Sequence, residues 1–224
     1  MTAIHPRRSN IDAAFRGFVG DPRFSCLAGK GVVRADRYTL GVYGSLGSQR
    51  SARALARDLA AFVAAPDAGD SAFRSMVAVF PARAPRDETA FEKSLWIQLQ
   101  LLHERDDPRA GWDPAVSDDP EDPRFAFSFA GCGLFVIGLH AASSRLARRF
   151  GWPALIFNPH AQFADLRATG RFERLRTIVR EREVALQGSL NPNLADLGER
   201  SEARQYSGRA TEAEWGCPFH RKSP

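Results

Sequence analysis

The chain has 224 residues, of which 44% are hydrophobic and 25% charged, and its formal net charge is +5. These values match an average globular protein and exclude a disordered one, and the length predicts a single domain over residues 1–224. The longest apolar run, 133–139, is too short to span a bilayer, and residues 1–10 lack the apolar core of a secretory signal. We therefore expect a cytoplasmic protein with no membrane partner.

The cysteines and the basic residues exclude further classes. Cys26, Cys132 and Cys217 lie far apart and form no CxxC pair, which argues against a disulfide framework or a zinc cage. No run of five basic residues and no zinc-finger, RRM or KH signature occurs, so we expect no nucleic-acid partner. Most of the positive charge is arginine, the side chain suited to binding carboxylates and phosphates.

Apolar periodicity predicts four elements in the first half of the chain, after a polar leader. In order, they are a strand at 37–43, a helix at 49–64 capped by Ser48, a strand at 76–80, and a helix that begins after Asp87 or Thr89. Residues 105–124 form an acidic, proline-rich loop, which fits either a lid or a solvated connector.

The second half predicts two strands, 125–130 and 134–140, joined as a hairpin at residues 131–133. A short basic helix at 143–150, a strand at 154–157 and a long helix at 159–187 broken near Gly170 follow, and the polar residues from about 188 to 224 wrap the domain. The fold class is therefore α/β: a single-domain sandwich with a mixed, partly antiparallel sheet flanked by helices.

His160 stands where a strand gives way to a helix. Asn158 is a good N-cap and Pro159 suits the first helical position, so His160 lies at a strand-to-helix turn, where α/β proteins often bind ligands. Phe163 and Arg167 share a helical face with it. The two interpretations are a ligand-binding histidine and one that only hydrogen-bonds locally.

Three arginines follow His140 at the end of a strand. Arg145, Arg148 and Arg149 have helical i, i+3 and i+4 spacing, and such mutually repelling guanidinium groups indicate an anionic partner. Alternatively, they pair with the acidic residues at 118–122.

Other motifs are weak or absent. Cys26 lies in a small flexible loop at 24–31, and Cys217 in the segment WGCPFH fits either tail packing or a thiolate ligand. No GxSxG, HExxH, Walker A or GxGxxG element occurs in a usable context, which excludes the common hydrolase, zincin, P-loop and Rossmann classes.

An ordered series of segments resembles the YqcI/YcgG family, in particular its branch of heme-dependent N-hydroxylases of guanitoxin biosynthesis. The resemblance extends from Phe24 to Phe219, and the segments are FAGCGLFVIGLHAASSRLARR (129–149), PALIFNPHAQFADLR (153–167), LQGSLNPNLADLG (186–198), SEARQYSG (201–208) and WGCPF (215–219). Two positions depart from the pattern: Ser25 replaces part of an expected phenylalanine-proline-cysteine triplet, and Leu197 replaces an expected histidine.

The resemblance implies a heme b enzyme, a monooxygenase that hydroxylates a guanidino or side-chain amino nitrogen of an arginine- or lysine-like amino acid. It implies a basic amino-acid substrate, dioxygen and a reductase as external electron donor, and it allows a homodimer. The rival functions are a non-catalytic heme carrier or gas sensor, and a heme-free interaction protein.

The implied roles can be assigned residue by residue. His160 is the expected iron ligand, with His140, Cys217 and Cys26 as alternatives. The other cofactor contacts are Phe163 and the arginines Arg145, Arg148 and Arg149, which would bind heme propionates or the substrate carboxylate. The catalytic candidates are His140 and Asp165, with Glu202 as a second carboxylate for a basic substrate.

Overall fold

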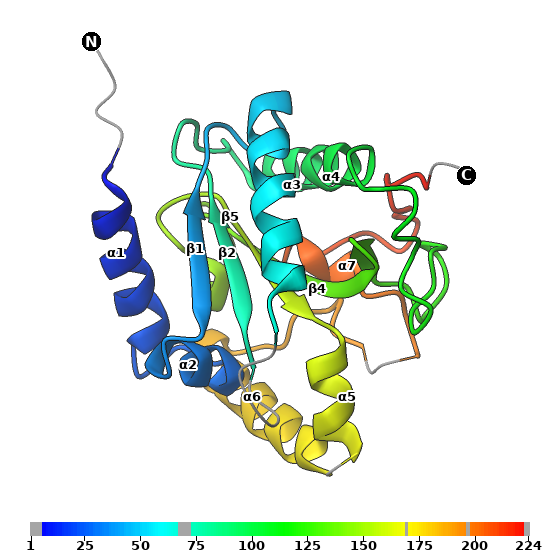
Figure 1. Ribbon diagram of the computed structural model, residues 1–224. Helices are drawn as coiled ribbons and strands as arrows, with labels where there is room; N and C mark the ends of the chain where they lie inside the picture. Colours follow the sequence, from blue (N-terminus) through cyan, green and yellow to red (C-terminus); the bar gives the residue numbers. More distant parts are fainter. Residues whose placement is uncertain (1–5, 67–72, 169, 196–197, 222–224) are drawn as a thin grey trace.

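The computed structural model describes residues 6–66, 73–168, 170–195 and 198–221, except for the side chains of residues 164 and 165. These residues form seven α-helices, a 3₁₀ helix and five strands (Figure 1). In chain order they are α1 (Arg8–Gly20), α2 (Leu27–Arg34), β1 (Tyr38–Val42), α3 (Gln49–Ala64), β2 (Ser75–Val79), α4 (Glu88–His103), β3 (Phe127–Phe129), β4 (Cys132–Leu139), the 3₁₀ helix η1 (Leu146–Arg148), β5 (Ala154–Pro159), α5 (Ala161–Ala168), α6 (Arg171–Gln187) and α7 (Ala203–Tyr206).

The described strands form a mixed sheet in the order β1-β2-β5-β4-β3. The β1–β2 pair is parallel and the other three pairs are antiparallel, which confirms the α/β class and the partly antiparallel sheet. The hairpin of β3 and β4 is also confirmed. Its turn lies at Ala130 and Gly131, whose φ angles of 51° and 72° suit a two-residue hairpin loop, and not at 131–133 as predicted.

Helices cover both faces of this sheet. In Figure 1, α1, α2 and α6 lie on one side of the strands, and α3, α4 and α7 on the other. Successive side chains of β2 point to opposite faces of the sheet. Met76 and Ala78 belong to the core under α3 and α4, whereas Val77 and Val79 belong to the core under α1. Every residue of β2 is therefore buried.

The predicted polar leader and the flexible loop at 24–31 are wrong. Residues 8–20 form α1, and α2 occupies 27–34. The sequence does contain a signal for α1: Ile11, Phe15 and Val19 recur at helical spacing, and all three are buried. Polar and small residues separate them in the sequence, so the composition of this segment does not reveal the apolar face of the helix.

The predicted basic helix at 143–150 is also wrong, because only the three-residue η1 forms there. Backbone groups of this segment make non-helical hydrogen bonds. The backbone N–H of His140 donates to the carbonyl of Arg148, and the backbone N–H of Ser144 donates to the carboxylate of Glu88. Three guanidinium groups therefore do not stack on one helical face.

The long helix predicted at 159–187 begins later and divides in two. Pro159 ends β5, so the helix starts at Ala161, and Gly170, with φ of 67°, separates α5 from α6. The break near Gly170 is confirmed. A left-handed φ of this kind is one that glycine adopts without steric cost.

The acidic loop at 105–124 is fastened to the hairpin. The Asp106 carboxylate accepts the backbone N–H of Ala130, and the Asp113 carboxylate accepts that of Gly133 at 2.7 Å. Trp112 packs against Phe125 and Phe127. These contacts anchor the loop as part of the packed body.

The residues after α6 run back across the body, where Tyr206 and Phe219 are buried in the core with α4 and the hairpin. In the part of the chain that the structure describes, no helix is both long and apolar enough to cross a membrane.

Gly138 in β4 permits close packing of α4 and the C-terminal segment against the sheet. A Cβ at this position would lie 2.6 Å from the Phe91 ring and 2.8 Å from the carbonyl oxygen of Tyr206. We expect Gly138→Ala to lower the free energy of unfolding by about 1–3 kcal/mol, measured by urea denaturation. Gly17→Ala, in an open position of α1, is the control and should raise it by about 0.4–1 kcal/mol. Equal effects of the two substitutions would contradict this packing.

Candidate functional site

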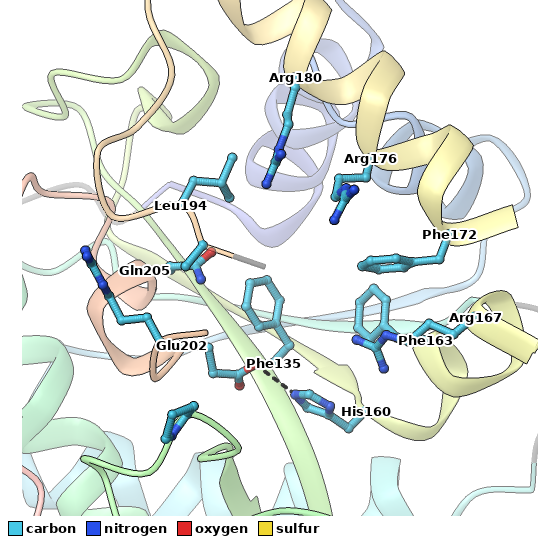
Figure 2. Close-up of a pocket in the computed structure, with 13 residues that line it drawn as sticks. Phe135, His160, Phe163, Arg167, Phe172, Arg176, Arg180, Leu194, Glu202 and Gln205 are labelled. Atoms are coloured by element: carbon cyan, nitrogen blue, oxygen red, sulfur yellow. Dashed lines mark hydrogen bonds and ion pairs between the residues drawn. The ribbon is translucent and has the colours of Figure 1, made fainter. Parts of the chain in front are cut away.

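A cavity of about 190 Å³ opens beside the end of β5, and we call it the His160 cavity. Strand β4, helices α5 and α6 and the C-terminal segment contribute to it, as Figure 2 shows. The lining residues are Pro123, Phe135, His160, Phe163, Arg167, Phe172, Arg176, Arg180, Leu194, Ala195, Arg200, Glu202 and Gln205.

Sheet pairing fixes the backbone of His160. Its N–H donates to the carbonyl of Gly133 at 2.8 Å, which extends the β4–β5 ladder by one residue, and α5 begins directly afterwards. The predicted helix-start roles of Asn158 and Pro159 are wrong because both belong to β5. The Asn158 side chain instead accepts a hydrogen bond from Ser75 and donates one to the carbonyl of Phe135.

His160, Glu202 and Tyr206 form a short chain of buried polar groups. The Nε2 atom of His160 lies 2.9 Å from Oε2 of Glu202, and the Tyr206 hydroxyl donates to the other carboxylate oxygen at 2.7 Å. The side chains of His160 and Glu202 are 12% and 9% exposed. An ionised Glu202 accepts the Nε2–H, and in that tautomer Nδ1 of His160 retains the lone pair that a metal ligand needs.

Burial reinforces this arrangement. Tyr206 is fully buried, and its surroundings and the charge of Glu202 raise the pKa of its hydroxyl well above 10. It therefore stays a hydrogen-bond donor at neutral pH. The same oxygen accepts the backbone N–H of Phe127 at 3.0 Å, so β3 holds Tyr206 in place.

The cavity combines aromatic walls with cations. Phe163 packs edge-on against Phe135 and His160, and the Arg167 guanidinium lies over the Phe172 ring at 4.7 Å. Burial lowers the pKa of Arg167, an effect that the carboxylate of Glu202 opposes. The remaining cations are contributed by α6 and the C-terminal segment: Arg176, Arg180 and Arg200. Glu202 is the one acid among the described residues that line the cavity.

Another cavity, of about 260 Å³, adjoins the His160 cavity and is called the second cavity below. It lies between the sheet and the helices α1, α2 and α6, and it shares the walls Phe135, Phe163, Leu194 and Gln205 with the His160 cavity. Two of the three arginines singled out in the sequence, Arg145 and Arg148, line it.

The alternative that these arginines pair with residues 118–122 is wrong. Arg145 binds Glu183 at 2.6 Å, Arg148 donates to the carbonyl of Tyr206 at 2.9 Å, and Arg149 donates to the carbonyl of Ser143. None of the three lines the His160 cavity.

His140, the predicted catalytic residue and alternative ligand, does not line the His160 cavity. Strands β4 and β5 are antiparallel, so the residue after β4 and the residue after β5 lie at opposite ends of the pair. Their backbones are about 20 Å apart at about 3.3 Å per strand residue. His140 is fully buried, stacks on Phe91 at 4.1 Å, and has no hydrogen-bond partner for either ring nitrogen among the described residues.

The thiols do not face His160. Cys217 packs against the core under α4, where burial raises its pKa to about 12. Cys26 lines the second cavity and accepts the backbone N–H of Gly29, and burial raises its pKa as well. Ser25 is buried beside it.

The structure does not describe the side chain of Asp165, whose backbone belongs to α5, and it does not describe Leu197. The proposed role of Asp165 therefore stays a prediction.

Most of the lining residues escaped the sequence analysis, and so did Tyr206 behind them. Phe135 lies on β4, Phe172 on α6, and Tyr206 in a segment with weak patterning. No local signal marks them, because strand pairing and the return of the C-terminal segment bring them to His160. Within the described ranges, no group of three or more His, Cys, Asp or Glu side chains could hold a bare metal ion.

Comparison with known proteins finds a matching family model and a similar bacterial protein. The model of the YqcI/YcgG family matches residues 15–220. The chain is also 26% identical over 212 residues to a Bacillus subtilis (strain 168) protein named "Uncharacterized protein YqcI", a match that covers 90% of this chain and 83% of that one. No solved structure matches significantly.

The buried His140 predicts a loss of stability in mild acid. Burial lowers its pKa from 6.5 to about 4, so between these values the unfolded chain binds a proton that the folded chain does not. Stability should therefore fall as the pH decreases from about 6.5 to about 4, by at most about 1.4 kcal/mol per pH unit from this group. His140→Leu should have a shallower pH dependence in urea unfolding, whereas the exposed control His220→Gln should follow the unmodified protein. Parallel curves for all three proteins would contradict this assignment.

Proposed function

This chain belongs to the YqcI/YcgG family, and on that premise we propose that it is a heme-dependent N-monooxygenase of the guanitoxin N-hydroxylase type. Its reaction hydroxylates a guanidino or side-chain amino nitrogen of an arginine- or lysine-like amino acid. The observation that supports this most directly is a single histidine, held by a buried carboxylate, at the end of a strand in an aromatic cavity lined by arginines. The proposal keeps a reductase as the external electron donor.

The side chains of the lining suit heme b, and because a volume of about 190 Å³ has room for only roughly six groups of the size of a water molecule, heme would enter only as the cavity widens. His160 has a carboxylate partner, one of the partners that orient histidine metal ligands, and Nδ1 is the nitrogen that Glu202 leaves available. Phe135, Phe163 and Phe172 offer apolar surfaces for a flat macrocycle, and the cavity arginines suit its propionates. Bound heme would supply the activation of dioxygen.

The lining also fits a basic amino acid. Such a substrate has a carboxylate at one end and a cationic nitrogen at the other. Arginines such as Arg167 and Arg200 suit the carboxylate. Glu202 already holds the ring nitrogen of His160 that would not bind iron, so we propose that the predicted catalytic carboxylate, Asp165 of α5, receives the substrate cation.

The residues of the chain then have separate tasks. Glu202 sets the tautomer of His160, and the aromatic walls exclude water from the space above it. The arginines bind the substrate carboxylate and would thereby direct its side-chain nitrogen toward the His160 end of the cavity.

Replacing His160 should remove the cofactor. After expression with a heme precursor, the unmodified protein should show a Soret band and about one heme b per chain, while His160→Ala should lose most of it because its iron ligand is gone. His140→Ala is the matched control: it removes the other buried histidine, far from the cavity, and should retain heme. Unfolding curves establish that both variants are folded. A colourless unmodified protein would contradict the proposal, as would a ferrous carbon monoxide band at the red-shifted position of a thiolate-ligated heme.

The second test concerns turnover. Heme-loaded protein supplied with oxygen, a reductant and arginine or lysine should convert one of them to a product heavier by one oxygen atom, detected by mass spectrometry. Norleucine is the matched control substrate, because its side chain has the four carbon atoms of the lysine side chain but no nitrogen to hydroxylate. Heme binding without mass gain for any basic amino acid would favour a carrier or gas sensor instead.

A further inference from the structure

The second cavity is mainly apolar and has no assigned role. Its walls include Val19 from α1, Val33 from α2, and Ile137 and Ile156 from the central strands. The volume of about 260 Å³ has room for roughly nine groups of the size of a water molecule. Apolar walls of this extent favour an organic occupant over water.

One end of the cavity carries uncompensated positive charge. Arg145 and Arg148 both line it, and Glu183, the one carboxylate among the described lining residues, is already bonded to Arg145 at 2.6 Å. Arg148 donates to two neutral acceptors, the carbonyls of Tyr206 and Gly138. Its burial lowers the pKa of the guanidinium to about 10, which still leaves it charged at neutral pH.

The neighbouring groups do not cancel this charge. Lys30 of α2 and Arg182 of α6 both donate to the carbonyl of Pro22. Arg148 is partly buried, and a cation removed from water without an anionic partner is costly, so an anion in the adjoining cavity removes much of that cost. The space next to Arg148 therefore has the charge and the polarity of a carboxylate site.

Backbone geometry keeps Arg148 in this position. Gly208 has φ of 83°, and a Cβ there would lie 2.5 Å from Cδ of Arg148. The absence of a side chain at Gly208 thus allows the Arg148 side chain to pass against the backbone and end at the cavity.

We propose that the second cavity binds a free organic carboxylate with an apolar body of about eight to ten carbon atoms, its carboxylate on Arg148. This ligand differs from the basic amino acid proposed for the His160 cavity, because Arg145 and Arg148 repel a cationic side chain and the apolar walls offer it no solvation. The site is independent of the proposed function. It adjoins the His160 cavity through Phe135 and Phe163.

Octanoate is the probe for this site. Calorimetric titration of the heme-free chain should show one site for octanoate, with much weaker binding of octanol and octylammonium. Arg148→Gln should lower octanoate affinity by about tenfold or more, because a charge-assisted hydrogen bond is lost. Arg149→Gln is the matched control: it removes the same charge from the next residue, which does not line the cavity.

A second variant covers the case in which Arg148→Gln does not fold. Ile156→Trp places a larger apolar side chain in the cavity, leaves Arg148 in place, and should also abolish octanoate binding. Absence of octanoate binding, or equal binding of octanoate and octanol, would overturn the proposal.

A heme propionate is the other carboxylate that could occupy Arg148, and heme-loaded protein distinguishes it. Retained octanoate affinity in the loaded protein supports the free carboxylate. Loss of octanoate binding on loading, with release of heme by excess octanoate, would assign the anion to heme and overturn the proposal. Heme retention by itself tests only the proposed function. The heme proposal and the octanoate-site proposal can therefore fail independently of each other.

Discussion

The buried hydroxyl of Tyr206 is the point on which the candidate site depends. It accepts the backbone N–H of Phe127 from the sheet and donates to Glu202, which in turn holds the imidazole of His160. One phenol thereby joins the returning C-terminal segment to the sheet and orients the cavity histidine. Because its pKa is raised by burial, it donates this hydrogen bond across the whole physiological pH range.

The antiparallel pairing of β4 and β5 separates two histidines that are close in the sequence. His160 follows β5 and borders a cavity, whereas His140 follows β4 at the far end and stacks on Phe91 inside the core. Each histidine directly follows a strand, yet the two have different environments. Burial lowers the pKa of His140 and keeps its ring neutral at neutral pH, whereas the Glu202 carboxylate fixes the orientation of the His160 ring.

The arginines likewise divide between two tasks. Arg145 is compensated by Glu183, and Arg149 binds a backbone carbonyl, so both fasten the segment after β4 to its surroundings. Among the described residues, Arg148 has only carbonyl partners, and it borders the second cavity. Near His160, Arg167 lies over an aromatic ring and interacts with the charge of Glu202, which also lines that cavity. Arginines therefore line both of the adjoining cavities.

The sequence alone determined much of the fold, because local rules are sufficient for regular elements. The helix 49–64 with its Ser48 cap, the strands, the hairpin and the break at Gly170 follow from periodicity, capping and glycine. It also indicated His160, Phe163, Arg167 and Glu202, all of which line one cavity. Only the tertiary structure decided that Tyr206 and Phe135 join them, that His140 does not, and that Arg148 faces a different space. Those outcomes depend on strand direction and on the return of the C-terminal segment, which are contacts between residues distant in the chain and leave no periodic signal in it.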